Sequence, residues 1–163
     1  MKRVVDASPA LFLAKIGALE LLQLGAEEVL MPSAVLQEIV QVNDSASVVV
    51  LDAKEKWLVE CEYRAEQSIA SSSLGPGERA VIEQALGLGV EQVVMDDLAA
   101  RRVAQQLGLK PIGTLGILLA AKLTGAIPSV SEKIEALKAV GMYLSESLIQ
   151  RILREAGEGE SPR

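Results

Sequence analysis

The residues best suited to do chemistry in this sequence are acids spaced along the chain. The sequence contains no histidine and a single cysteine, Cys61. The commonest general base and transition-metal ligand is therefore missing, and one thiol forms neither an intramolecular disulfide nor a thiolate cluster. Carboxylates remain as candidate ligands, and they suit Mg²⁺ or Mn²⁺ better than zinc or copper. The acids in question are Asp6, Glu38, Glu78, Asp96 and Asp97.

A cluster of these carboxylates would repel itself without a metal, because each negative charge raises the pKa of its neighbours. A divalent cation relieves that repulsion. It also polarises a phosphoryl oxygen and lowers the pKa of a bound water, which supplies the nucleophile that the absent histidines cannot. The acids therefore point to metal-dependent hydrolysis of a phosphate ester.

Each acid also has an explanation that needs no ligand. Asp6 can cap a helix, and Glu78 falls in an expected first helical turn, where the helix dipole favours an acid. Asp97 can pair with Arg101 one turn later. Glu38 differs from these, because its neighbours on the expected helix are apolar and a buried carboxylate needs a partner.

The chain alternates short apolar runs with amphipathic segments. Ser8-Pro9 and Thr114 are expected to start helices, Gly17 and Gly25 to divide residues 10–24 into two short helices, and the tail from Gly157 to fray. The expected strands are 3–5, 28–31, 58–62, 92–95 and 110–112. The other expected helices are 32–40, one reaching Lys56, 78–86, 98–107, 114–122, 131–140 and 145–156.

Strands separated by helices predict an α/β fold, a three-layer α/β/α sandwich with a mostly parallel sheet and extra C-terminal helices. In such a sheet the ligand site lies off the carboxyl ends of the strands. The candidate acids follow the expected strands or lie on the helices after them. They are therefore expected to meet at one edge of the sheet.

Composition narrows the class of protein. A chain of 163 residues predicts one compact domain, and its 50% hydrophobic content excludes intrinsic disorder. The start of the chain lacks the apolar stretch of a signal peptide, and no run approaches the roughly 18 apolar residues of a membrane span. We therefore expect a cytoplasmic protein.

Two patterns that are typical of phosphate-binding loops do not by themselves indicate a phosphate site in this sequence. Gly75-Pro76-Gly77-Glu78 follows serines instead of a strand and would present an acid to the phosphates, so it is interpreted as a turn. Gly113-Thr114-Leu115-Gly116 can offer backbone N–H groups to an anion, but close helix packing explains it equally well. A Walker A motif is absent, which excludes nucleotide-driven motors.

The order and context of the acids resemble the PIN-domain nucleases, whose best-known branch is the toxin ribonucleases of the virulence-associated protein C type. The resemblance covers about residues 3–125, and the closing helices continue it to Ala156. Residues 96–101 and 112–118 look like an uncharacterised PIN-like subfamily of bacteria and archaea. The motifs are Val4-Val5-Asp6-Ala7-Ser8-Pro9, Val35-Leu36-Gln37-Glu38-Ile39, Gly75-Pro76-Gly77-Glu78-Arg79-Ala80 and Met95-Asp96-Asp97.

The resemblance implies cleavage of RNA that depends on Mg²⁺ or Mn²⁺, homodimers, and often a small antitoxin partner, as for the toxin of a toxin–antitoxin pair. It divides the chain into a PIN-like catalytic domain, 1–125, and a C-terminal helical extension packed on it, 126–163. Asp6, Glu38, Glu78 and Asp97 are the implied catalytic acids, which hold one or two metal ions, with Asp96 as a weaker fifth ligand. Glu78 stands where many members carry Asp, and Met95 where Ser or Thr often precedes the last aspartate.

Contacts to the substrate must be local, because a chain with net charge −6 repels a polyanion as a whole. The candidate residues for substrate contact are Ser8, Arg101, Arg102 and Thr114, and Lys110 and Lys122 are further cations for the same patch. Solvated helix surface is the alternative interpretation of each cation.

Two alternatives remain beside the nuclease. The first is a PIN-like binding module that has lost catalysis and acts through a protein partner. The second is a phosphoacceptor receiver domain, which also gathers acids and Mg²⁺ at strand ends. Receivers place their paired acids after the first strand, whereas here the pair, Asp96-Asp97, comes late and only Asp6 follows the first strand.

Overall fold

Five short runs rich in apolar residues form one parallel sheet in the computed structural model, which describes residues 1–64, 69 and 74–159. The sheet order is β3-β2-β1-β4-β5, and all neighbouring strands are parallel. β1 is central, and Val4 and Val5 are fully buried. The strands are β1 (Lys2–Val5), β2 (Glu28–Pro32), β3 (Leu58–Cys61), β4 (Gln92–Val94) and β5 (Lys110–Ile112).

The strand order reverses direction beside β1. The chain moves outward from β1 to β2 and β3, and then returns to add β4 and β5 on the other side of β1. In register, Val4 lies opposite Leu30 of β2 and Val93 of β4. The junction of β1 and β4 is thus a topological switch point, where open α/β sheets bind ligands outside the carboxyl ends of the strands.

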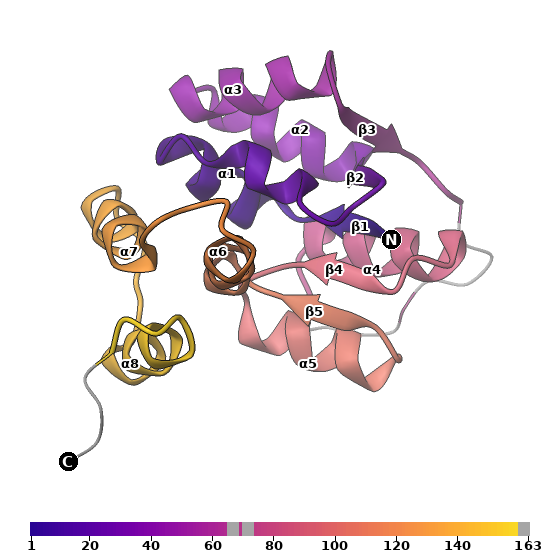
Figure 1. Cartoon of the computed structure of the whole chain (residues 1–163). Coiled ribbons are helices and arrows are strands. Elements are labelled where there is room, and N and C mark those ends of the chain that lie inside the picture. Colours follow the sequence, from indigo (N-terminus) through magenta and orange to yellow (C-terminus); the bar gives the residue numbers. More distant parts are fainter. Residues whose placement is uncertain (65–68, 70–73, 160–163) are drawn as a thin grey trace.

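Helices cover both faces of the sheet and complete the three-layer α/β/α sandwich (Figure 1). On one side α4 packs on β1, β2 and β4, and α5 packs on β5; elsewhere η1 packs on β2, and α1 and α6 pack on each other and on η1. The helices are α1 (Ala7–Lys15), the 3-10 helix η1 (Leu19–Gln23), α2 (Ser33–Val42), α3 (Ser45–Lys54), α4 (Pro76–Leu88), α5 (Leu98–Gln106), α6 (Thr114–Leu123), α7 (Val130–Ala139) and α8 (Glu146–Glu155).

This architecture confirms the predicted fold class, and two helix starts differ from the prediction. Helix α1 begins at Ala7 and is capped by Asp6, not by Ser8, because the Asp6 carboxylate already accepts the Ala7 amide. Helix α6 has Gly113 as its N-cap residue, because the Thr114 hydroxyl bonds to Asp96 instead of to its own helix.

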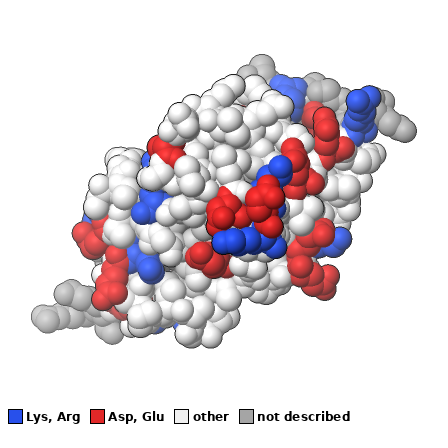
Figure 2. Space-filling model, turned by 90° about the horizontal axis from the view of Figure 1, so that it is seen from above, with Lys and Arg blue, Asp and Glu red and all other residues white. Residues whose placement is uncertain are grey.

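Charge on the outside of the fold is mixed. Figure 2, which looks onto the side where α3 lies, shows acidic and basic side chains intermingled among uncharged surface. Two ion pairs involve α3 or the turn after it: Lys54 with Glu60 at 3.3 Å, and Lys56 with Asp52 at 2.8 Å. This face therefore lacks the single-sign basic field that would attract a polyanion over a wide area.

The C-terminal helices pack on α6. Leu137 of α7 is fully buried and Ile149 of α8 is nearly so, while Leu144, Leu148 and Leu153 are partly buried against the core. These apolar side chains therefore cover the core of their own chain. Among the residues that the structure describes, no helix is both long and apolar enough to cross a membrane.

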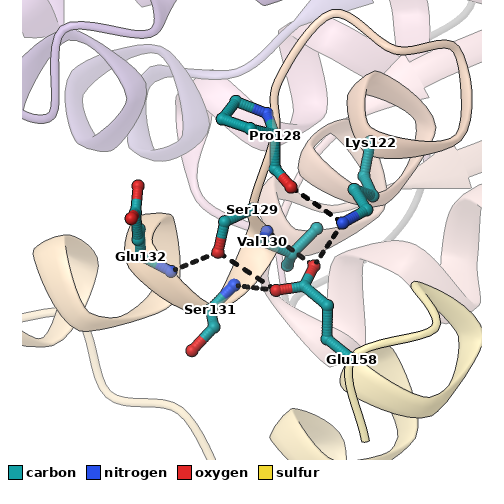
Figure 3. A network of polar contacts seen from close by, with 7 residues as sticks. All are labelled: Lys122, Pro128, Ser129, Val130, Ser131, Glu132 and Glu158. Atoms are coloured by element: carbon teal, nitrogen blue, oxygen red, sulfur yellow. Dashed lines mark hydrogen bonds and ion pairs between the residues drawn. The ribbon is translucent and has the colours of Figure 1, made fainter.

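Glu158 fastens the end of α8 to the start of α7 (Figure 3). Its carboxylate accepts hydrogen bonds from the Val130 amide at 2.8 Å and from the Ser131 amide and Ser129 hydroxyl, both at 3.1 Å. Lys122 of α6 adds an ion pair at 3.4 Å and also donates to the Pro128 carbonyl. The prediction of a frayed tail is thus wrong for residues 157–159, because a carboxylate here satisfies the free amides of a helix N-terminus. The rest of the predicted tail, 160–163, lies outside the described residues.

We predict that Glu158→Gln destabilises the fold at neutral pH. Burial alone would raise the pKa of Glu158, but the Val130 and Ser131 amides, the Ser129 hydroxyl and Lys122 together lower it. The charged form therefore stabilises the fold above the ordinary carboxyl pKa, and this contribution disappears as the pH falls through the lowered value. Weakening these charge-assisted bonds should cost on the order of 1–3 kcal/mol.

Thermal unfolding of wild type and Glu158→Gln at pH 7 and at acid pH measures this effect. Glu155→Gln, which changes an exposed acid at the end of α8, is the control and should leave the unfolding temperature unchanged. Equal unfolding temperatures for Glu158→Gln and wild type at pH 7 would contradict the prediction.

Candidate active site

Four acids from separate parts of the chain gather at the carboxyl edge of the sheet. Asp6 follows β1, and Asp96 lies two residues beyond the end of β4, so the switch point brings them to neighbouring strand ends. Glu38 comes from α2, and Glu78 from the first turn of α4. Helices α2 and α4 pack against each other, which brings their acids to the same edge.

Asp6 is the most buried of these acids, with 6% of its surface exposed. Its amide donates to the Val94 carbonyl at 2.9 Å, and its carboxylate accepts the Ala7 amide at 2.9 Å, which caps α1. The prediction that Asp6 caps a helix is therefore confirmed.

Capping does not account for the electrostatics of Asp6. Burial raises the pKa of Asp6 to about 7, and the negative charges of Glu78, Glu38 and Asp96 add to this, while the hydrogen bond from Ala7 acts in the opposite direction. A helix cap by itself would only lower the pKa. Asp6 is thus an acid whose ionisation is opposed by its surroundings, a feature that is enriched at functional sites.

Glu38 reaches the site because α4 carries a glycine opposite it. The carboxylate of Glu38 lies against Gly77, so close that a Cβ atom at this position would collide with it. Glu38 is half-buried. Gly77 therefore provides the space in which the Glu38 carboxylate sits between α2 and α4.

Glu78 has a structural contact as well as a place in the cluster. Its Oε2 accepts the Gly75 amide at 3.1 Å and so closes the N-terminus of α4. An open cavity of about 340 Å³ is lined by Asp6, Glu38 and Glu78, together with Ser8 and Gly77. Three of the candidate acids and one candidate substrate contact thus border the same space.

Asp96 is held by two hydrogen bonds from the start of α6. The Thr114 amide and the Thr114 hydroxyl each donate to one of its carboxylate oxygens, both at 2.7 Å. Thr114 is fully buried. The structure thus places Thr114 behind Asp96, where it orients the carboxylate, and not on the exposed surface as a substrate contact.

Asp97 lies apart from this arrangement. It is exposed, and its carboxylate accepts the Ala100 amide at 2.9 Å as the N-cap of α5. Although both residues are described, Asp97 and Arg101 form no ion pair. A Cβ atom at Gly113 would lie 3.0 Å from Asp96 Oδ1 and 3.1 Å from Arg101 Nη1. The Arg101 guanidinium therefore lies near the Asp96 carboxylate, beside Gly113.

The predicted basic patch is only partly assembled near the acids. Arg101 is half-buried beside Gly113, and Arg102 is exposed on α5. Lys110 pairs with Glu91 at 3.0 Å, and Lys122 pairs with Glu158. The two lysines are therefore engaged in ion pairs with other acids.

The acids match a hard divalent cation in chemistry, because every donor is a carboxylate oxygen. Within residues 1–64, 69 and 74–159, however, no three acidic, histidine or cysteine side chains stand close enough together to hold an ion as they are. Burial first, and then the negative charges of Glu78, Glu38 and Asp96, raise the pKa of Asp6, so a bound cation would offset both effects. Asp6, Glu38, Glu78 and Asp96 are the residues that would hold the ion.

Sequence reasoning missed two residues that shape this site, Thr114 as the support of Asp96 and Gly77 as the space for Glu38. Both contacts join segments that are far apart in the chain. The hydroxyl directly after Ile112-Gly113 is a local signal for Thr114, but the same pattern also fits a helix cap or an anion site. Nothing in the local sequence marks Gly77 beyond its place in a turn.

Comparisons with known proteins bear on the fold and the family. No curated protein matches the sequence. Among solved structures, the chain is similar to a PilT N-terminus domain protein from the hyperthermophilic archaeon Sulfolobus solfataricus P2, with a TM-score of 0.58 and 15% identity over 74% of this chain and 93% of that one. Residues 2–158 match the model of a family described as the PIN domain. The match covers nearly the whole chain, and the chain therefore belongs to the PIN-domain family, whose members are generally nucleases.

Proposed function

We propose that this PIN domain is a divalent-metal-dependent ribonuclease that hydrolyses phosphodiester bonds in RNA. The observation that carries the proposal is the convergence of Asp6, Glu38, Glu78 and Asp96 at the switch point, with the pKa of Asp6 raised to about 7. A buried carboxyl whose ionisation is opposed adds nothing to stability at neutral pH, because a neutral side chain at Asp6 would avoid the penalty of burial and repulsion. Membership in the PIN family supports nuclease chemistry at this edge.

The four acids have distinct parts in the proposed site. Asp6, the most buried, gives up its proton when a cation binds, and Glu38 and Glu78 supply further oxygens from α2 and α4. Asp96 presents its carboxylate in the orientation that Thr114 fixes. When bound, Mg²⁺ or Mn²⁺ polarises a phosphoryl oxygen and lowers the pKa of a bound water.

In this proposal Asp96 takes the catalytic place that was predicted for Asp97. The carboxylate of Asp97 is engaged by the Ala100 amide and is exposed, whereas Asp96 contributes to the raised pKa of Asp6. Asp97 then stabilises α5, the helix that carries Arg101 and Arg102. Arg101 and the Ser8 hydroxyl are the proposed contacts to the phosphate backbone.

The remaining sequence predictions are not needed for this function and stay predictions. They are a role as toxin of a toxin–antitoxin pair, a small antitoxin partner, a homodimer, a cytoplasmic location and the division at residue 125. The alternative of a binding module that acts through a protein partner is an outcome of the first experiment below.

We expect purified protein to cleave single-stranded RNA with Mn²⁺ or Mg²⁺ and to lose this activity in EDTA. Asp6→Asn and Asp96→Asn should each lower the rate more than about 100-fold, because each removes a negative oxygen from the proposed metal site. Fluorogenic RNA and DNA substrates, compared side by side, report activity and the preference for RNA.

Asp52→Asn, an exposed change on α3, is the control and should cleave like wild type. If wild type cleaves nothing, the nuclease proposal fails and the binding module becomes the leading function. If the Asp6 and Asp96 variants cleave as fast as wild type, the activity comes from elsewhere.

Metal-free Asp6→Asn should unfold at a higher temperature than wild type at pH 8. Folded Asp6 keeps its proton up to about pH 7, whereas an unfolded aspartate loses it near 4. The folded state thus binds more protons in this range, so wild-type stability falls as the pH rises from about 4 to 7 and stays low above it. We expect the variant to gain about 1–2 kcal/mol, or roughly 2–8 °C, at pH 8.

Thermal unfolding in EDTA at pH 3 and pH 8 tests this sign, because the two proteins should converge near pH 3, where Asp6 is mostly protonated in both the folded and the unfolded state. A variant no more stable than wild type at pH 8 would show that the Asp6 carboxylate is not under electrostatic strain.

Gly77→Ala should impair cleavage without weakening the fold. The added methyl group must displace the Glu38 carboxylate, while alanine within a helix is favoured over glycine by roughly 0.5–1 kcal/mol. We expect a loss of activity of about 10-fold or more and an unfolding temperature equal to or above that of wild type. Unchanged cleavage would remove Glu38 from the proposed site.

A further inference from the structure

A groove of about 560 Å³ runs from the acid edge of the sheet to the C-terminal helices. Its walls come from α5, from the start of α6 and from the segment 142–152, which includes the first part of α8. Figure 1 shows α5 and α8 on either side of α6. Asp96 and Asp97 line one end, so the groove opens beside the candidate active site.

Two arginines line this groove without partners. Arg101 is half-buried on α5, and Arg151 is exposed on α8. Within the described part of the chain, neither guanidinium takes part in a hydrogen bond or an ion pair. Guanidinium groups are planar, permanently charged donors that match phosphate geometry, so two unpaired arginines in the lining provide anion contacts along the groove.

The groove also carries an aromatic side chain that the core does not use. Tyr143 is 90% exposed, in a chain with only four aromatic residues. It lies just after Gly141, whose φ of +94° lets the chain turn at the end of α7, where the Gly141 and Met142 amides bond back to Lys138 and Leu137. The turn brings Met142, Tyr143 and Leu144 into the groove wall, where a ring can stack on a base.

We infer that this groove binds the single-stranded RNA on one side of the cleaved bond, with backbone phosphates at Arg101 and Arg151 and a base against Tyr143. The inference rests on the proposed nuclease function and adds the strand path to it. A single strand fits, because its bases are free to stack, and the apolar floor at Ile112 and Leu115 suits a base or ribose. The free guanidinium groups favour a polyanion over an apolar peptide helix.

Binding to a labelled single-stranded RNA that carries 2′-O-methyl groups tests this path apart from catalysis. Fluorescence anisotropy is measured with full-length protein in EDTA and again with Ca²⁺, at several salt concentrations. Arg151→Ala should raise the Kd about 5- to 10-fold and reduce the salt dependence by about one phosphate contact. Tyr143→Ala should raise the Kd about 5-fold or more.

Arg154→Ala is the matched control, because Arg154 is an exposed arginine on the same helix outside the groove lining. Its Kd should stay within 2-fold of wild type. Equal weakening by Arg151→Ala and Arg154→Ala, or no RNA binding by wild type in either condition, overturns the groove. So does unchanged RNA binding by Arg151→Ala combined with an altered oligomeric state, which would make the groove a protein interface.

The outcomes also separate this inference from the nuclease proposal. If RNA binding depends on Arg151 but no RNA is cleaved, the groove is supported as an RNA-binding site and the nuclease proposal is rejected. If cleavage depends on metal but Arg151→Ala and Tyr143→Ala bind RNA like wild type, the nuclease proposal is supported and the groove is rejected as the RNA path.

Discussion

The parallel pairing of β1 with β4 is the constraint on which the candidate site depends. It ends two strands side by side, so that Asp6 and Asp96 emerge at the same edge, and the bond from the Asp6 amide to the Val94 carbonyl extends the pairing to the acid itself. Burial at this junction opposes ionisation of the Asp6 carboxyl. The neighbouring helices position two other acids: α4 leaves space for Glu38 at Gly77, and α6 holds Asp96 through Thr114.

Helix capping and site chemistry share the same residues here. Asp6 closes α1 and Glu78 closes α4, so each carboxylate is oriented by backbone amides before any ligand is present. Such bonds preorganise an acid, because its rotamer is fixed by the fold and not by the ligand. Asp97 shows the other outcome: the same kind of cap at α5 leaves its carboxylate exposed and outside the cluster.

The α/β class, the five strands and nearly all helix positions were accessible from the sequence, because apolar runs and capping residues are local signals. The gathering of Asp6, Glu38 and Glu78 was predictable from their places after strands or on the following helices. The choice between Asp96 and Asp97 was not, since it depends on which neighbour faces Thr114 across 18 residues of chain. The arginine-lined groove could not be predicted either, because Arg101 and Arg151 line the same groove only through the packing of α8 on α6.

The Glu158 contact turns the C-terminal part of the chain into a closed ring. Lys122 and Glu158 join the end of α6 to the residue that caps α7, so everything between them is tethered at both ends. A ring closed in this way loses little further entropy when its helices settle on the sheet layer. Loss of the Glu158 contact would open this ring at one point, while α8 keeps its buried side chains Ile149 and Ile152 and the strands that carry the acids remain paired.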